Sequence, residues 1–301
     1  MIVPVTYLEE GSPMMSQADA GTPTFAVVAD STSDIAPESA AQEGIIVVPL
    51  TVTIGDESFT DGVLSQQEFF DRMRAAERLP STSQPSVGAF TDAYTRALET
   101  ADQVISVHIS SKLSGTLESA YAAAEQFVGR VHVFDSLNLS WGCAWQVVEA
   151  ARCAAEGISP DAALKRIASV RDRVGLIVGV DALDNLAKGG RIGRVGALLG
   201  SLLNLKVTFT VGPDGAFVPV ARSRGEKAAL EHTLGWVAEK MGSAKSGRFA
   251  VGHALSRERA VWLSEEIAKR FEVTEMVVYE TGSVISTHTG TGWGVAVLPD
   301  L

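Results

Sequence analysis

Serine and threonine side chains crowd the segment Pro80–Ser86, directly ahead of a helix predicted over 87–100. Prolines at both 80 and 85 hold this backbone extended, and its hydroxyl and amide groups can donate hydrogen bonds to an anion. Ser86 stands where a helix N-cap is expected, which accounts for only one of these side chains. Thr82 and Ser83 are therefore predicted to contact a ligand.

A second hydroxyl-rich segment, Ser110–Thr116, lies between a predicted strand and a predicted helix. The backbone N–H groups and the positive end of the dipole at a helix start favour a bound carboxylate or phosphate. Ser114 and Gly115 are the candidate contacts in this segment. The alternative is that Ser114 only caps the helix, which requires no ligand.

The segment Lys188–Arg194 combines basic side chains with glycines. Glycines allow close approach of the backbone to a ligand, and the guanidinium of Arg191 can pair with a carboxylate. The spacing of a nucleotide-binding phosphate loop is missing, and the segment follows a predicted helix at 181–187 instead of a strand. Charges on a surface turn are the alternative interpretation.

A histidine flanked by hydroxyl groups, His288, lies in the segment Ile285–Gly292. Such an imidazole can point into a cleft and exchange a hydrogen bond with a carboxyl group, with Thr289 beside it. The alternative is a structural histidine bonded to a carbonyl oxygen. The other four histidines lack the spacing of metal ligands, so no metal site and no cofactor are predicted.

The segment Asp30–Asp34 follows the first predicted strand and consists of carboxylates and hydroxyls. Open α/β sheets bind ligands at the carboxyl ends of their strands, which makes this segment a candidate binding loop. An Asx turn together with a helix N-cap before Pro37 explains the same residues equally well.

The elements that must position these segments form an α/β pattern. Strands are predicted at 25–30, 45–54, 103–110 and 131–135, and helices at 66–77, 87–100, 115–128, 144–156 and 161–173. This alternation predicts a buried parallel sheet covered by helices. A second set begins after Arg173, with strands at 175–180, 206–211, 216–221, 248–254, 273–279 and 294–298 and helices at 226–240 and 257–270.

We therefore predict two α/β domains, at 24–174 and 175–301, after a disordered or tag-like leader at 1–23. The net charge of −11 disfavours contact with nucleic-acid phosphates. Two cysteines in one predicted helix indicate buried thiols rather than a disulfide framework. With no long apolar run and no signal-peptide pattern, a cytoplasmic protein is expected.

Together these motifs make the chain resemble the DegV family of fatty-acid-binding proteins. The resemblance rests on the Asp30–Asp34 segment, Thr82-Ser83-Gln84-Pro85, Ser110–Thr116, Lys188-Gly189-Gly190-Arg191-Ile192 and Thr287-His288-Thr289-Gly290. The motifs occur in the family's order and span roughly residues 24–299. Where the family usually has Gly-Pro-Gly after the histidine, this chain has Gly290-Thr291-Gly292.

The resemblance implies the DegV, or EDD, fold, with a ligand tunnel at the domain interface and into the C-terminal domain. It implies a bound long-chain, palmitate-like fatty acid whose carboxylate meets Thr82, Ser83, Ser114, Arg191 and His288. Arg222 and Arg224 are associated less firmly with head-group or partner contacts. An ATP-dependent fatty acid kinase is the implied partner, in phospholipid synthesis, and transient membrane contact stays open.

Two further expectations concern the pocket for the acyl chain and the alternative function as a serine hydrolase. The apolar segment Ala197–Leu203 is a candidate tunnel wall, although ordinary core packing explains it as well. A non-catalytic carrier is favoured over a serine hydrolase in which His288 and an aspartate such as Asp30 activate Ser114. No Gly-x-Ser-x-Gly nucleophile elbow is present, but geometry and not sequence order identifies such a triad.

Overall fold

The computed structural model describes residues 7–8, 24–198 and 205–301, and these form two compact units. The N-terminal unit contains residues 24–51 and 82–173. The C-terminal unit contains residues 7–8, 52–81, 174–198 and 205–301. Residues 52–81, which the sequence pattern places in the first domain, thus lie in the C-terminal unit.

The N-terminal unit is built on a four-stranded parallel sheet, as predicted from its short β-branched runs. Its order is β3-β2-β7-β8, and every neighbouring pair is parallel. The strands are β2 (Ala26–Asp30), β3 (Ile45–Val48), β7 (Val104–His108) and β8 (Val131–Asp135). All five residues of β7 are buried, as expected for a central strand.

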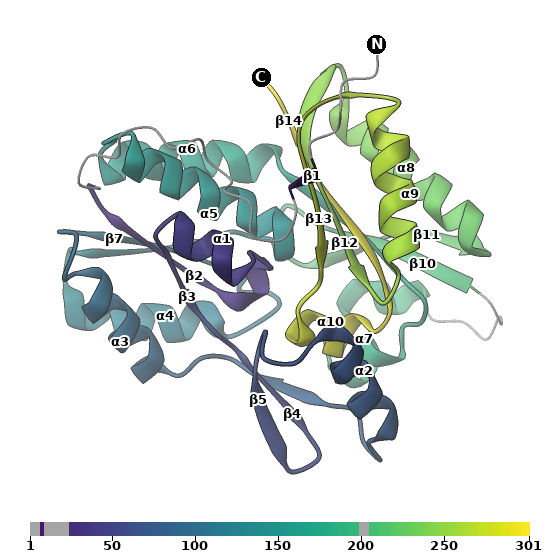
Figure 1. Ribbon diagram of the computed structural model, residues 1–301, viewed down its shortest axis with the longest axis horizontal. Helices are drawn as coiled ribbons and strands as arrows, with labels where there is room; N and C mark the ends of the chain where they lie inside the picture. Colours follow the sequence, from purple (N-terminus) through teal and green to yellow (C-terminus); the bar gives the residue numbers. More distant parts are fainter. Residues whose placement is uncertain (1–6, 9–23, 199–204) are drawn as a thin grey trace. The chain divides into compact units, whose positions relative to one another are not determined.

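Helices cover both faces of this sheet. Figure 1 shows α3 and α4 on one side and α5 on the other, with α6 packed on α5. The helices of this unit are α1 (Pro37–Gln42), α3 (Val87–Ala97), α4 (Thr116–Ala124), α5 (Ser140–Ala155) and α6 (Pro160–Arg173), with short 3-10 turns at Ser31–Ser33 and Glu125–Phe127. Phe90 and Tyr94 of α3 pack on the sheet together with Ala120 and Ala123 of α4.

Both cysteines lie in α5 and are buried and unbonded to each other, as the sequence predicts. Burial raises the pKa of the Cys143 thiol far above its usual range and that of Cys153 to about 11. The thiols therefore stay protonated and unreactive at neutral pH.

The C-terminal unit is built on a mixed seven-stranded sheet of order β1-β13-β12-β14-β9-β10-β11. Its strands are β1 (Tyr7–Leu8), β9 (Gly175–Val180), β10 (Leu205–Val211), β11 (Phe217–Arg224), β12 (Ser246–Ala254), β13 (Glu272–Glu280) and β14 (Gly292–Pro299). The β1–β13 and β12–β13 pairs are parallel, and the other pairs are antiparallel.

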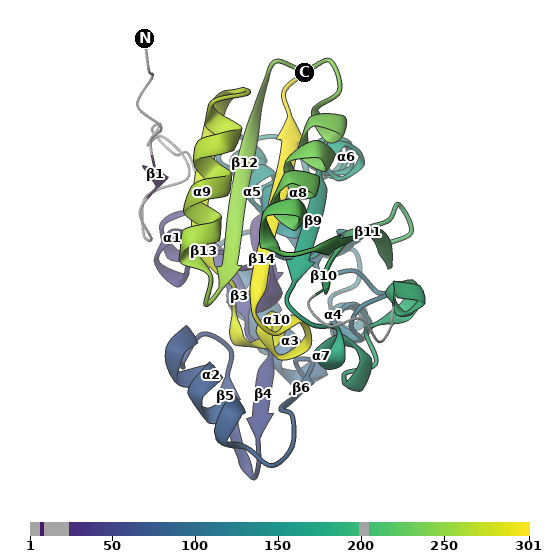
Figure 2. The same ribbon diagram turned by 90° about the vertical axis from the view of Figure 1, so that its right-hand side faces the viewer.

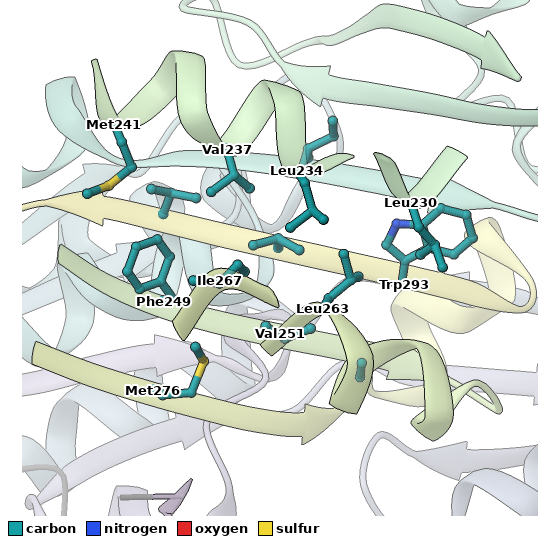
Figure 3. Close-up of a cluster of buried hydrophobic side chains, with 14 of the residues drawn as sticks. Leu230, Leu234, Val237, Met241, Phe249, Val251, Leu263, Ile267, Met276 and Trp293 are labelled. Atoms are coloured by element: carbon teal, nitrogen blue, oxygen red, sulfur yellow. The ribbon is translucent and has the colours of Figure 1, made fainter. Parts of the chain in front are cut away.

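Two long helices, α8 (Glu226–Met241) and α9 (Arg257–Ala268), cover one face of this sheet (Figure 2). Between them and the strands lies the apolar cluster of Figure 3, in which Leu234 and Leu263 from the helices meet Phe249 and Val251 of β12. Trp293 of β14 closes one end of the cluster, and its indole N–H donates to Thr233 (3.0 Å). Two shorter helices, α7 (Asp184–Lys188) and α10 (Ser283–Thr289), contact each other.

A third, small sheet has the order β5-β4-β6, with β4 at Thr51–Ile54, β5 at Glu57–Thr60 and β6 at Ser81–Ser83. The helix α2 (Gln66–Ala75) lies between β5 and β6 in the chain. The single strand predicted at 45–54 is therefore wrong: it is two strands, β3 and β4, in different sheets. Pro49 lies at the break, where its missing N–H cannot contribute to a strand ladder.

Candidate functional site: two sets of predicted contact residues

The two hydroxyl-rich segments of the N-terminal unit contact each other. Thr82 and Ser83 end β6, and the Gln84 amide that follows donates to Ser119 Oγ of α4 at 2.9 Å. A Cβ added at Gly115 would lie 2.1 Å from Gln84 Oε1, so only glycine admits the amide this close. The fold thus brings Thr82-Ser83-Gln84 and Ser114-Gly115 together, although they are about thirty residues apart in the sequence.

Helix capping accounts for part of this polar cluster. Ser86 accepts a bond from the Ala89 N–H (3.1 Å), which confirms it as the N-cap of α3. Ser114 Oγ accepts from the Thr116 N–H (3.3 Å) and shares a bond with Thr116 Oγ1 (2.8 Å). The N-cap of α4 is Gly115, without a side-chain cap bond, so the Ser114 hydroxyl closes a local turn ahead of the helix, where it is half-buried.

The segment at Asp30 is structural. The carboxylate of Asp30 is 1% exposed and accepts hydrogen bonds from the backbone N–H of Thr32 (3.0 Å) and of Ile109 (3.0 Å). The hydroxyl of Thr32 also donates to it, and His108 Nδ1 lies 3.1 Å from its second oxygen. This favours the Asx-turn interpretation over a ligand-binding loop.

The Asp30 network continues through the interior of the unit. His108 Nε2 lies 2.6 Å from Ser106 Oγ, which accepts a bond from the hydroxyl of Tyr94 (3.0 Å). These groups resemble a serine–histidine–aspartate relay, but Ser106 and His108 are 0% exposed and cannot reach a substrate. Because Asp30 orients His108, it is not the aspartate of a triad with Ser114 and His288, and the hydrolase hypothesis finds no support.

The C-terminal unit brings His288 of α10 against the glycine-rich segment after α7. A Cβ added at Gly189 would lie 2.4 Å from His288 Nδ1, so glycine is required for the ring to approach. The turn is held by the Arg191 backbone N–H, which donates to Leu186 O (3.0 Å), and by the Arg191 guanidinium, which donates to Gly189 O (2.8 Å). The motifs containing Arg191 and His288 are therefore one cluster.

Thr289, the remaining predicted contact, directs its hydroxyl back into its own helix. It is buried, and its Oγ1 donates to Ile285 O at 3.1 Å. Asn185, which the sequence analysis missed, donates to Thr287 O (3.1 Å) and so holds the C-terminal end of α10. No sequence motif marks Asn185, because the contact joins residues 102 positions apart.

Of the two arginines that the resemblance associates less firmly with head-group or partner contacts, Arg222 donates to Ala197 O at 2.7 Å. Both Arg222 and Arg224 are exposed on the edge strand β11. Most of the candidate tunnel wall, residues 199–203, lies outside the described residues, and Ala197 at its start is exposed.

Electrostatics keep the His288 imidazole neutral. Burial lowers the pKa of His288 to about 4, and the positive charge of Arg191 acts in the same direction. His288 can therefore exchange a neutral hydrogen bond with a ligand at pH 7, and the positive charge of the cluster belongs to Arg191. The pKa of the buried His253 is also lowered to about 4, by burial and by Arg257.

These two histidines predict a pH dependence of stability. The unfolded chain takes up protons on both as the pH falls below about 6.5, while the folded unit resists protonation down to about pH 4. Stability should therefore fall progressively between these pH values. The lowered pKa values of carboxylates such as Asp30 act below about pH 3.8, outside this window.

Urea denaturation from pH 7.5 to pH 4.5 measures this effect. Replacing His253 and His288 by glutamine should flatten the pH dependence, whereas the exposed His232→Gln variant is the control for loss of a histidine. An unchanged slope in the double variant would contradict the prediction.

No helix in the described part of the chain is both long and apolar enough to cross a membrane. Within the same ranges, no group of three or more histidine, cysteine or acidic side chains is arranged to hold a metal ion.

The fold and the two sets of residues define a two-unit α/β protein with clustered hydroxyls in one unit and a histidine–arginine cluster in the other. The family model described as "Uncharacterised protein, DegV family" matches residues 24–300. A DegV domain-containing protein from Deinococcus radiodurans is 39% identical over 92% of this chain and 99% of its own length. The chain belongs to the DegV family.

Solved structures agree with this assignment. A DegV family protein from Thermus thermophilus, described by its fatty acid binding, is 37% identical, with a TM-score of 0.87 over 91% of this chain and 99% of its own. DegV from Bacillus subtilis, described as a fatty acid binding protein, is 31% identical, with a TM-score of 0.81 over 92% of this chain and 100% of its own. The α/β fold of the DegV type is thereby confirmed.

Proposed function

We propose that this protein binds one long-chain fatty acid and acts as a carrier without catalysing a reaction itself. The residues that we propose for contact with its carboxylate are Thr82, Ser83, Ser114, Gly115, Arg191 and His288. The observation that carries the proposal is the cluster at Gly189, where a guanidinium and a neutral imidazole lie together. The fatty acid binding described for the Thermus and Bacillus relatives supports it.

Each group in the proposed site has a distinct task. Arg191 supplies the positive charge that compensates the carboxylate, and His288 supplies a neutral hydrogen bond. Thr82, Ser83 and Ser114 supply hydroxyl donors, whereas Thr289 shapes the end of α10, because its own proton is used within the helix. No cofactor is needed for binding of this kind.

The free energy of binding should come mainly from the acyl tail. A palmitate-like chain has about fifteen methylene groups, and burying each contributes about 0.8 kcal/mol, or about 12 kcal/mol before the costs of association. A hydrogen bond to a charged group contributes about 1.5–3 kcal/mol, which the dehydration of the carboxylate largely offsets. The tail thus sets the affinity and the polar residues set the orientation.

The proposal extends to a partner. A fatty acid is activated for phospholipid synthesis by phosphoryl transfer to its carboxylate, which requires ATP, and the glycine-rich segment at Lys188 lacks phosphate-loop spacing. We therefore assign that chemistry to a separate ATP-dependent fatty acid kinase in the cytoplasm, to which this protein presents the carboxylate. Transient contact with a membrane would load the tail.

Native mass spectrometry of the purified protein tests the proposal, with an expected mass increment of one fatty acid. The double variant Thr82→Ala, Ser114→Ala should bind the fatty acid about 5- to 150-fold more weakly, since dehydration of the carboxylate leaves each lost bond a net contribution of about 0.5–1.5 kcal/mol. The control removes two hydroxyls from α3 instead, in the variant Thr91→Ala, Thr95→Ala. An unliganded wild-type protein that also fails to take up added fatty acid would refute the carrier function.

A further inference from the structure

The helix that carries His288 depends on a residue far away in the sequence. Helix α10 has only seven residues, and the residue at its N-cap, Gly282, has no side chain with which to cap it. Such a short helix is marginal by itself, because its first N–H groups lack partners within the helix. Its stability must come from its surroundings.

Asp61 caps this helix from the segment between β5 and α2. Its Oδ1 accepts a hydrogen bond from the Ser283 hydroxyl at 2.7 Å and one from the Val284 backbone N–H at 3.1 Å. A carboxylate at a helix N-terminus also interacts favourably with the helix dipole. Asp61 thus plays the part of an N-cap residue although more than 200 positions separate it from α10.

Gln66, the first residue of α2, fixes the chain that leads into α10. Its side-chain amide donates to Thr281 O (3.3 Å) and to His253 O (2.9 Å), and its Oε1 accepts from the Leu255 N–H (2.6 Å). Gln66 is 8% exposed, so these bonds are shielded from water. The carboxyl ends of β12 and β13 and the start of α10 are therefore tied to α2.

The other end of α10 meets the arginine-bearing turn. Asn185 holds Thr287 O, and Gly189 lies against the ring of His288. Val284 is one helical turn before His288, so a shift at the capped end is transmitted to the imidazole within a single turn. Both ends of the helix must be held for the ring to keep its place beside Arg191.

We propose that Asp61 is a positioning residue for the fatty acid head group, which acts by fixing α10 and thereby His288. The role in binding rests on the proposed function, whereas the coupling of Asp61 to His288 does not. The residue itself is not assigned a contact with the ligand.

The test compares Asp61→Ala with Asp61→Asn in the full chain. The alanine variant removes the acceptor for the Ser283 hydroxyl and the Val284 N–H, so the His288 ring should become more exposed to water. Its titration midpoint should then rise by about one pH unit or more, as followed by NMR at the ring Cε1–H. Its affinity for palmitate should fall about fivefold to thirtyfold. The asparagine variant keeps an acceptor oxygen and should restore most of both properties.

Asp71→Ala is the matched control, because Asp71 lies on the adjacent helix α2 and pairs at the surface with Gln67 and Arg74. It removes the same charge and should leave the His288 titration and the palmitate affinity unchanged. Ser283→Ala, which removes one of the two bonds to Asp61, should give an intermediate shift and serves if Asp61→Ala does not fold.

A double-mutant cycle separates positioning from a general loss of stability. In a His288→Ala background, Asp61→Ala should cause little further loss of palmitate affinity; an equal loss in both backgrounds would overturn the proposal. An unchanged His288 titration in folded Asp61→Ala would also overturn the proposal. If Asp61→Ala does not fold, an unchanged His288 titration in Ser283→Ala would overturn it instead. If the wild-type protein binds no fatty acid, the carrier function fails, while the His288 titration still decides the role of Asp61.

Discussion

Replacing Asp30 by alanine is expected to lower the free energy of unfolding of the N-terminal unit by about 3–5 kcal/mol, because several buried groups, including the His108 ring and the Thr32 N–H, lose their hydrogen-bond partner at about 1–3 kcal/mol each. Asp30 and His108 are 1% and 0% exposed, and neither can recover hydrogen bonds from water. The backbone N–H of Ile109 would lose its acceptor as well. Burial by itself would raise the pKa of Asp30, but the bonds from His108, Thr32 and Ile109 outweigh it and hold that pKa below its usual value.

The sign of the associated pH effect follows from this lowered pKa. The unfolded chain binds a proton on Asp30 near pH 3.9, whereas the folded unit does not until the pH is lower. The contribution of the carboxylate is therefore complete at neutral pH and is lost as the pH falls below about 3.9. In the alanine variant this part of the acid transition should be missing.

Hydrogen exchange of the amides of β2 and β7 measures the change in the unit concerned. Asp92→Ala is the control, since Asp92 is exposed on α3 of the same unit and its loss changes the net charge equally. Asp30→Asn should also destabilise the N-terminal unit. An amide N–H group cannot accept the hydrogen bonds that the Asp30 carboxylate accepts from His108 and Ile109. A single ordinary hydrogen bond contributes about 1 kcal/mol. If Asp30→Ala lowers the free energy of unfolding by less than this, the network around Asp30 is not needed for stability.

The second large effect is expected from Gly189→Ala in the C-terminal unit. The added methyl group would lie 2.4 Å from His288 Nδ1 and 3.0 Å from Asn185 O, which is too close for the ring to stay where it is. Gly189 has a φ of −75°, which alanine adopts without strain, so the effect comes from the ring contact and not from the backbone. The imidazole must move away from the turn that carries Arg191.

Under the proposed function this displacement costs one or two head-group bonds of about 1.5 kcal/mol each, or about a tenfold to hundredfold loss of fatty acid affinity. Isothermal titration with palmitate measures the loss, and the NMR resonance of the His288 ring reports the movement directly. Gly235→Ala is the control: it lies in α8 with no atom within 4 Å of the added Cβ, and it should keep the affinity and slightly stabilise the helix. An unmoved His288 resonance in Gly189→Ala would contradict the prediction.

Much of the secondary structure was predictable because its signals are local. The apolar runs at 25–30, 131–135 and 175–180 coincide with β2, β8 and β9 within one residue. Ser86 was predicted as an N-cap, and the structure confirms it. Each of these features depends on the order of neighbouring residues, which the sequence displays directly.

Other elements have no local signal. No helix was predicted at Ser283–Thr289, because its Ser-Thr-His-Thr composition has low helix propensity. In the structure Asp61 caps the start of α10 and Asn185 bonds to its end. The assignment of residues 52–81 to the C-terminal unit likewise depends on contacts between residues far apart in the sequence. It depends on contacts such as Gln66 with Leu255, across 189 positions.

By itself the sequence determined the α/β class, most of the strands and helices, and the motifs whose residues carry the proposed binding. Tertiary structure alone decided that Asp30 belongs to a buried relay with His108, that Gly189 lies against His288, and that Asp61 caps the helix of that histidine. The physical reason is range: periodicity and capping act between near neighbours, whereas these contacts exist only after the chain has closed loops of about 80 to 220 residues.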